Sequence, residues 1–187
     1  NFRSRGPSSP YNVYRKRKGK PPKGLNENHA RELLELHTVS PDCGYTQEDV
    51  INAANIMTGW GFVRKSGKRE HVEDREVGYN GKVHEPGTHV VMGRKFKPEG
   101  FDVKTKGKKQ LRDLVEYLSS HESCRRFISW KLCRHFICDD PTDDMVQMVV
   151  DAWETSDGML PDIHRAVLWA AWTFGDRYRK FQMPETW

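Results

Sequence analysis

The spacing of apolar residues predicts helices over much of the chain. In two early windows, side chains recur at i, i+3, i+4 and i+7, which is the spacing of one helix face. These positions are Ala30, Leu33, Leu34 and His37, followed by Val50, Ala53, Ala54 and Met57. Asn26 is a favourable N-cap before the first window, and residues 46–49 (TQED) match a capping box before the second. We therefore expect two helices joined by a short turn, with His37 in the core.

Helical spacing returns after residue 108. Three helices are predicted there from their apolar faces, and each face is expected to point inward. The inward positions are Leu111, Leu114, Val115 and Leu118, then Phe127, Ile128, Leu132 and Phe136, then Met145, Val149, Ala152 and Trp153. A last helix from Leu160 to Trp172 is so apolar that we expect it to be the most buried. Most of the six tryptophans are likewise expected in the core.

Between residues 60 and 105 the helical spacing disappears and glycine becomes frequent. Asn80-Gly81 is the strongest short hairpin signal in this stretch, and residues 89–92 (HVVM) have the composition of a strand. The predicted fold class is therefore mainly α. We expect a helical bundle-like domain over residues 25–187, with a small β-hairpin or loop insertion at 60–105.

The first 24 residues differ from the rest in charge and composition. They hold eight of the Lys and Arg residues and no acid, in a chain whose net charge is +5. Pro, Gly and Ser interrupt this run, so we expect an irregular, solvated segment. An alternative is that residues 15–23 bind a polyanion. Nucleic acid is the less favoured partner, because neither a helix nor an aromatic platform is predicted beside the basic residues.

Other classes of protein are excluded or constrained by simple counts. No apolar stretch approaches the roughly 20 residues that a transmembrane helix needs, and the mean hydropathy is −0.83. The chain begins with Asn, so we expect that the true N-terminus lies upstream. The cysteines form no C-x-x-C pair, which argues against a zinc ribbon. Cys124, Cys133 and Cys138 are expected to be buried thiols, although the basic residues near Cys133 raise the alternative of an activated thiol.

One polar helix face is the main candidate for chemistry. Asn28, Arg31, Glu32 and Glu35 lie opposite the first apolar stripe, and Asn26 and Glu27 lie at the start of the same helix. Two carboxylates three residues apart can bind a divalent metal together with a histidine from elsewhere, and His84 is the partner we propose at this stage. A purely structural alternative is an Arg31–Glu35 ion pair at i, i+4 or a buried ion-pair network. No G-x-S-x-G, H-E-x-x-H or P-loop motif is present.

Several segments together resemble a known family. Residues 24–38 (GLNENHARELLELHT) are similar to the signature G-L-N-E-N-[aromatic]-A-R-E-L-[LM]-E-L-H-T of a bacterial family called domain of unknown function 1800. Other segments of the chain resemble the family's remaining blocks, in the same order. These segments are residues 4–9 (SRGPSS), 44–50 (GYTQEDV), 58–60 (TGW), 84–87 (HEPG), 92–93 (MG), 121–141, 156–158 (SDG) and 180–184 (KFQMP). Two departures stand out: His29 replaces the usual aromatic residue, and Glu85 replaces an Asp.

The resemblance implies a mostly helical, exported bacterial protein, placed in the periplasm or outside the cell. The chain would correspond to the C-terminal part of the family's domain. The activity of that family is not established, so whether the protein is an enzyme stays open. The family is often encoded beside a protein that resembles the alkaline phosphatase–sulfatase superfamily, which makes such a protein the expected partner.

Three functional hypotheses follow. The first is a binding or assembly module that works with an envelope partner, and it predicts a broad exposed apolar surface. The second is a metal-assisted hydrolase that uses Glu32, Glu35 and His84, with Arg31 nearby, and it requires these side chains to converge on one cleft. The third is a polyanion binder through residues 15–23. Asn26, Glu27 and Asn28 are candidate binding residues because they belong to the family motif.

Overall fold

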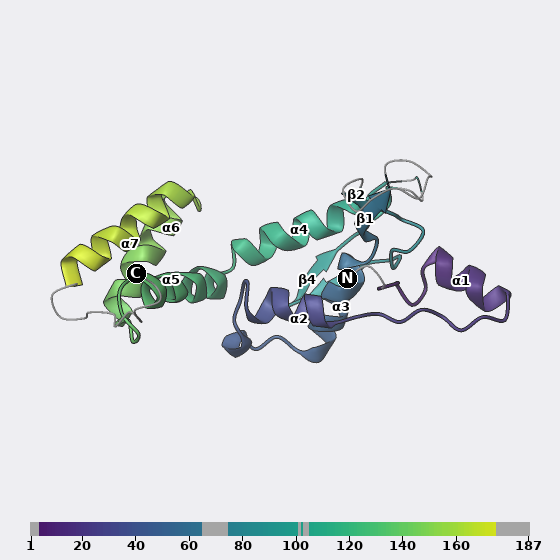
Figure 1. Ribbon diagram of the computed structural model, residues 1–187, viewed down its shortest axis with the longest axis horizontal. Coiled ribbons are helices and arrows are strands. Elements are labelled where there is room, and N and C mark those ends of the chain that lie inside the picture. The colour runs from purple at the N-terminus through teal and green to yellow at the C-terminus, as the bar shows by residue number, and fades with distance from the viewer. Residues whose placement is uncertain (1–3, 65–74, 101, 103–104, 175–187) are drawn as a thin grey trace. The chain divides into compact units, whose positions relative to one another are not determined.

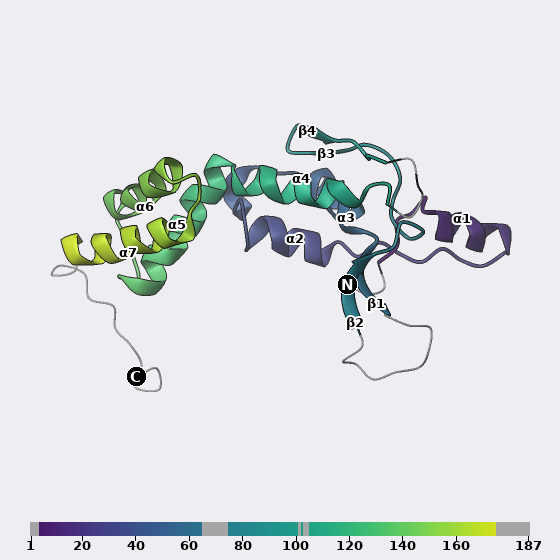
Figure 2. The same ribbon diagram turned by 90° about the horizontal axis from the view of Figure 1, so that it is seen from above.

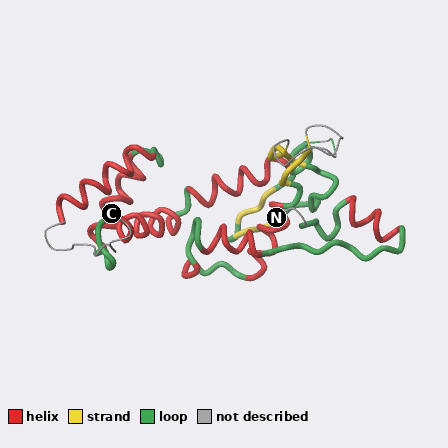
Figure 3. The backbone as a smooth tube through the Cα atoms, viewed as in Figure 1, coloured by secondary structure: helices red, strands yellow, loops and turns green. Residues whose placement is uncertain are grey.

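The computed structural model describes residues 4–64, 75–100, 102 and 105–174. The chain divides into two compact units, one made of residues 1–36 and 41–118 and the other of residues 37–40 and 119–187. Helices dominate both units, and two short antiparallel strand pairs lie in the first (Figure 3). This confirms the mainly α fold with a small β insertion. Across the described ranges, no helix is both long enough and apolar enough to cross a membrane.

Unit 1 combines five helical elements and four strands (Figure 1). In chain order these are α1 (Pro10–Arg17), α2 (Asn28–Glu35), the 3₁₀ turn η1 (Pro41–Cys43), α3 (Gln47–Met57), β1 (Trp60–Arg64), β2 (Arg75–Tyr79), β3 (His89–Val91), β4 (Arg94–Phe96) and α4 (Lys108–Ser119). Strand β1 pairs with β2, with Trp60 opposite Tyr79. Strand β3 pairs with β4, with His89 opposite Phe96.

The core of unit 1 forms where α2, α3, β3 and α4 turn their apolar faces inward. Its buried side chains are Ala30, Leu34, Val50, Ala53, Ala54, Ile56, Val91, Phe96, Leu114 and Leu118. The predicted stripes of α2 and α3 are thus largely confirmed. In α4 the buried face instead runs through Gln110, Leu114 and Leu118, and Val115 is 45% exposed, so its predicted inward position is wrong.

The starts of α2 and α3 follow from local hydrogen bonds. The capping box before α3 is confirmed, because Thr46 Oγ1 accepts from the Asp49 backbone N–H and Asp49 accepts in return from Thr46 N–H. Helix α2 begins at Asn28, where Asn26 Oδ1 accepts from the Asn28 N–H at 3.0 Å. It ends at Glu35, before His37, which is exposed. The prediction of a core histidine there is wrong because the helical stripe stops one turn earlier.

The prediction that residues 1–24 are irregular is wrong for α1. Ser9 caps this helix by accepting from the Asn12 N–H, and Pro10 occupies the first turn, where its fixed φ suits a helix and its missing N–H costs nothing. Ser-Pro is therefore a helix start here and not an interruption.

The β insertion is confirmed, but its tight turn lies elsewhere than predicted. Met92 and Gly93 both have positive φ values, 49° and 77°, and connect β3 to β4 as a primed hairpin turn requires. Asn80 instead follows β2 and closes a local turn, in which its side chain accepts from the Lys82 N–H. The Asn80-Gly81 pair therefore ends a strand and does not connect two.

Unit 2 is built from α5 (Glu122–Phe136), α6 (Asp143–Thr155) and α7 (Leu160–Phe174), which pack on one another (Figure 2). Its core consists of Cys133, Ile137, Cys138, Met145, Val149, Ile163, Val167 and Ala170. Two predictions fail here. Phe136 is 63% exposed, and α7 buries only one side of its apolar surface instead of being the most buried helix.

Candidate functional site

His84 lies at the centre of a buried polar network in unit 1. Its Nδ1 is 2.8 Å from the Thr58 carbonyl oxygen, and its Nε2 is 2.9 Å from Gln110 Oε1. The Gln110 amide nitrogen donates to the carbonyls of Gly87 and Phe96, which fixes the orientation of the amide. Both ring nitrogens of His84 are therefore engaged by oxygen atoms of the protein, and neither is left to bind a metal ion.

Two glycines make room for the His84 ring. A Cβ placed on Gly107 would meet His84 Nε2. A Cβ on Gly59 would lie 2.8 Å from the Tyr79 ring and 3.0 Å from His84 Cβ. Both glycines also have positive φ, 85° and 89°, which disfavours any other residue. Burial raises the pKa of the neighbouring Tyr79, whose hydroxyl donates to the Lys106 carbonyl. The surroundings of His84 are thus closely packed.

Glu85 binds the N-terminal segment to the same region. Its side chain is nearly buried, and Oε2 accepts from the Ser8 N–H at 2.6 Å. Gly6 lies directly against the Glu85 backbone, where any side chain would collide with it. The Glu85 N–H donates to Thr58 Oγ1 at 2.8 Å. This carboxylate therefore holds two distant parts of the chain together.

The family-like residues of α2 serve mainly to connect helices. Arg31 Nη2 donates to Gln47 Oε1 at 2.6 Å, and Gln47 Nε2 donates to Glu27 Oε2 at 2.6 Å. This bridge joins the start of α2 to the start of α3 on the protein surface. The N-cap of α2 is Glu27, and Asn26 precedes it and accepts from the Asn28 N–H, as described above. Glu27, Arg31 and Asn26 thus have structural contacts that account for their positions.

The remaining members of the proposed metal site are not brought together with His84. Glu32 is exposed and Glu35 is half-buried on α2, whereas His84 is buried within the Thr58–Gln110 network. Among the described residues, no three His, Cys, Asp or Glu side chains are arranged to hold a metal ion. The convergence that the hydrolase hypothesis requires is therefore not seen for Glu32, Glu35 and His84.

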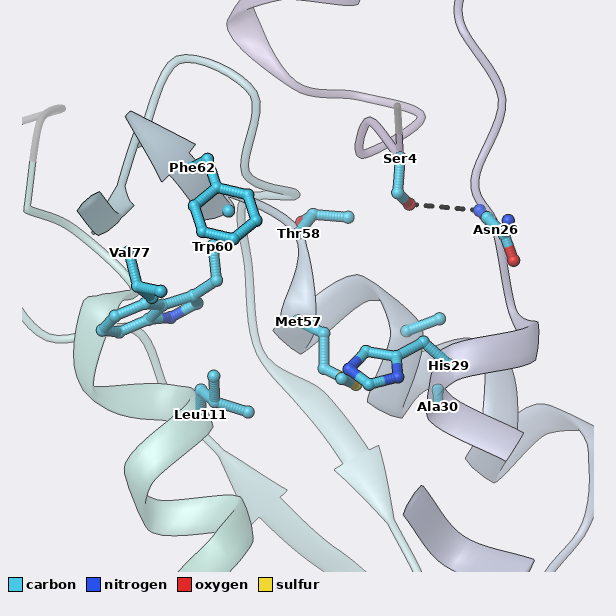
Figure 4. A pocket seen from close by; sticks show the side chains of 12 residues that line it. Ser4, Asn26, His29, Ala30, Met57, Thr58, Trp60, Phe62, Val77 and Leu111 are labelled. Carbon is cyan, nitrogen blue, oxygen red and sulfur yellow. Dashed lines mark hydrogen bonds between the residues drawn. The ribbon is translucent and has the colours of Figure 1, made fainter. Parts of the chain in front are cut away.

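A cavity of about 230 Å³ adjoins the start of α2 (Figure 4). His29, Ala30 and Met57 line one side of it, and Trp60, Phe62 and Val77 of the β1–β2 pair line another, with Leu111 contributed by α4. At its polar end, Ser4 Oγ accepts from the Asn26 N–H at 3.1 Å. The cavity is smaller than the roughly 300–1,000 Å³ typical of ligand pockets.

A family model described as a protein of unknown function, DUF1800, matches residues 1–187. The chain belongs to the DUF1800 family. No curated protein and no solved structure matches it. Membership confirms the resemblance drawn from the sequence blocks, although the last block, residues 180–184, lies outside the described residues.

The family blocks of unit 1 are spatial neighbours. The SRGPSS and HEPG blocks meet through the Ser8–Glu85 hydrogen bond, and the TGW block meets HEPG through Thr58 and His84. The longer Glu85, in place of the family's Asp, reaches the backbone of the N-terminal segment. His29, in place of the aromatic residue, faces the cavity in Figure 4.

In unit 2 the cysteines are buried, as expected. Cys124, Cys133 and Cys138 are buried, and all four cysteines of the chain are free. Burial raises the pKa of both Cys124 and Cys133 to about 11, so an activated Cys133 is not supported. His121 caps α5 by accepting from the Ser123 N–H, and the exposed His135 lies edge-on to the Phe136 ring.

One side of α7 carries several large apolar side chains that are exposed among the described residues. The exposed fractions are 72% for Leu168, 63% for Trp169 and 82% for Trp172. The expectation that most tryptophans are in the core is therefore wrong. Trp169 and Trp172 are exposed, and the other described tryptophans, Trp60, Trp130 and Trp153, are only partly buried. A groove of about 670 Å³ runs beside this side of α7, between Trp169 and Met148 of α6. This surface is named the α7 face below and is defined by Leu168, Trp169 and Trp172.

Sequence reasoning missed three residues that organise unit 1: Asn12, Thr58 and Gln110. Gln110 had a detectable signal, because it lies four residues before Leu114 on an otherwise apolar face. A polar residue at such a position is expected to have buried partners. Asn12 and Thr58 gave no comparable signal, because their bonds to Lys23 and His84 join residues 11 and 26 positions apart along the chain.

Proposed function

We propose that the protein is a binding or assembly module whose α7 face docks a protein partner. The observation that carries the proposal is the exposure of Leu168, Trp169 and Trp172 on one helix. Exposed single apolar residues are ordinary, but three large ones within five positions are not. Together they present roughly 400 Å² of apolar surface, a patch size that is often functional on a monomer.

The composition of the α7 face matches that of an interface centre. Tryptophan is enriched at the positions that dominate binding energy, where it fills pockets on a partner. Charged groups lie at the edge of this surface, where Arg165 and Asp162 pair with each other on the exposed side of the first turns of α7. An apolar centre with a polar rim is typical of protein–protein contacts.

The partner and location that we propose come from the family. The resemblance supports an exported bacterial protein that acts in the periplasm or outside the cell. It also supports a neighbouring protein of the alkaline phosphatase–sulfatase type as the partner. The metal-assisted hydrolase has no comparable support, because both ring nitrogens of His84 bond to Thr58 and Gln110.

Calorimetric titration with the phosphatase–sulfatase-like protein encoded beside the chain tests this proposal. Trp172→Glu places a charge at the centre of the α7 face and is expected to weaken binding about thirtyfold or more. The matched control is Gln147→Glu, which adds the same charge at an exposed position of α6. It is expected to bind like the wild type.

Two outcomes would overturn the proposal. One is a Trp172→Glu variant that is folded and binds the partner with unchanged affinity. The other is concentration-dependent dimerisation of the wild-type chain that Trp172→Glu abolishes, measured by sedimentation, which would make a second copy the occupant of the α7 face. Circular dichroism of both variants confirms folding, since neither position is buried.

A further inference from the structure

The N-terminal segment of unit 1 is held in one conformation by hydrogen bonds. Asn12 is buried and closes the segment, because its Nδ2 donates to the carbonyls of Gly6 and Lys23, and its Oδ1 accepts from the Lys23 N–H. The Tyr11 N–H donates to the Lys82 carbonyl at 2.8 Å. The basic residues that follow are thus presented from a fixed helix.

The basic residues gather at the C-terminal end of α1. Lys16, Arg17, Lys18 and Lys20 are all exposed, and no described acidic side chain forms an ion pair with any of them. Arg15 has a different role, because its Nε donates to the Pro21 carbonyl at 2.7 Å and its guanidinium lies over the Tyr11 ring. Four cations therefore face solvent together.

Favourable interaction with the helix dipole explains only part of this cluster. Cations in the last turn of a helix are stabilising, which accounts for Lys16 and Arg17. It does not account for Lys20, which lies beyond the helix. It also does not account for the two apolar side chains on the same helix that face solvent, Val13 at 41% and Tyr14 at 60% exposed. A cluster of basic residues is attracted to an anionic lipid surface, and apolar groups beside it can contact the boundary with the acyl chains.

The position of α1 leaves its basic end accessible to a large partner. Figures 1 and 2 both show α1 projecting at the end of a long excursion of unit 1. Binding of single-stranded nucleic acid would use a platform of rings for stacking. Tyr11 cannot serve, because Arg5 and Arg15 lie over its ring at 5.8 and 5.9 Å from the centroid, which leaves Tyr14 alone.

We propose that the projecting end of α1 binds the surface of anionic phospholipid bilayers, with Lys16, Arg17, Lys18 and Lys20 at the headgroups and Tyr14 and Val13 at the boundary with the acyl chains. Each basic side chain near such a surface contributes roughly fivefold in affinity. This surface is on unit 1 and is independent of the α7 face on unit 2.

Vesicle co-sedimentation of the 187-residue chain tests the proposal. The probes are vesicles of phosphatidylcholine alone and vesicles that also contain phosphatidylglycerol. We expect binding only to the second kind, and a steep loss of binding as salt is raised. The double variant Lys16→Glu, Lys18→Glu is expected to bind these vesicles at least twentyfold more weakly, on the order of two basic contributions.

A matched control distinguishes binding by the local basic surface of α1 from a general effect of the net charge of the protein. Lys95→Glu, Lys97→Glu makes the same charge change at exposed positions of the β4 region. It is expected to retain most of the binding. Tyr14→Ser, which leaves the charge unchanged, is expected to weaken binding severalfold through the loss of apolar contact.

The proposal is overturned by any of three results. The first is equal binding to both kinds of vesicle. The second is an equal loss of binding in the two double variants, which would indicate a non-specific effect of net charge. The third is tighter binding to a single-stranded oligonucleotide than to the vesicles, if that binding is lost in the Lys16→Glu, Lys18→Glu variant. This result would make nucleic acid the partner. Thermal melts of all variants verify that they fold.

Discussion

At the residue scale, the conspicuous polar residues of unit 1 are explained by contacts that stabilise the fold. His84 and Glu85 have the residue types of a catalytic pair, yet each is held by the backbone or by an amide of a distant segment. A buried polar group that lacks a hydrogen bond lowers the free energy of unfolding, so groups of this kind are normally hydrogen-bonded. Both residues therefore have contacts within unit 1 that account for their burial.

Asp49 is a second residue of this kind and provides a prediction. Its Oδ1 accepts from the Met92 N–H at 2.6 Å, and its Oδ2 accepts from the Thr46 N–H at 2.7 Å. Partial burial of Asp49 opposes ionisation, but the hydrogen bonds from Thr46 and Met92 prevail and lower its pKa. We expect Asp49→Asn to reduce the free energy of unfolding by about 1–2 kcal/mol at pH 7.

The pH dependence of that difference has a definite sign. Because the folded-state pKa of Asp49 is lowered, its stabilisation is complete above the unfolded value of about 3.9 and is lost as the pH falls through the folded value. The difference in free energy of unfolding between the wild type and Asp49→Asn, measured with denaturant, should therefore become smaller below about pH 4. Asp140→Asn, at an exposed site, serves as the control. A difference in free energy of unfolding that becomes larger in acid would contradict the lowered pKa of Asp49.

The cysteines provide a second prediction at this scale. Cys124 and Cys133 have pKa values raised to about 11 by burial, and Cys138 is also buried, so Cys43 alone is accessible. We expect a thiol reagent at pH 8 to modify one cysteine quickly in the native protein and all four after denaturation. Cys43→Ser should remove the fast phase, and a fast phase that persists would show that the buried thiols are exposed in solution.

At the element scale, α1 shows how a basic, proline-containing segment becomes ordered. Its N-cap is local, but its position depends on Asn12, whose side chain contacts both ends of the segment from Gly6 to Lys23. Helix α1 is too short to be stable by itself. The order of this segment therefore depends on side chain to backbone hydrogen bonds.

Replacement of Asn12 tests this dependence. Asn12→Ala leaves the Gly6 and Lys23 backbone groups without their partners, which is expected to cost about 1–3 kcal/mol. Hydrogen exchange should increase across residues 6–24 while the core amides of α3 remain protected. Asn52→Ala, in a half-buried position of α3, is the control for loss of an amide side chain. Unchanged exchange in residues 6–24 would contradict the role of Asn12.

Sequence patterns predicted the helices of this protein better than the contacts that each helix makes with distant parts of the chain. The capping box of α3 and the apolar stripes of α2 and α3 are local, and these predictions were confirmed. The Ser8–Glu85 hydrogen bond joins residues 77 positions apart, and no local pattern contains it. The exposed side of α7 was missed for another reason: residues 166–172 (AVLWAAW) are apolar on every side of the helix, so they give no indication of which side is covered.

At the scale of the whole molecule, the two units differ in what their surfaces offer. Unit 1 uses the family motifs to bind its own segments together and presents a basic helix. The described part of unit 2 contains three helices, and the α7 face is exposed among these residues. A surface of this kind is a liability for solubility unless a partner covers it. Docking of a partner on the α7 face is therefore the central functional proposal.

Oxidative footprinting of the tryptophans tests that claim most directly. The chain is labelled alone and in the presence of a phosphatase–sulfatase-like protein, the partner proposed above. Modification is measured at Trp169, Trp172 and, as a reference on unit 1, Tyr14. Because Trp172 is 82% exposed and Trp169 is 63% exposed, both should be readily modified in the free chain. The account predicts strong protection of both tryptophans in the complex with Tyr14 unchanged. Formation of a complex in which Trp169 and Trp172 are modified as fast as in the free chain would contradict it.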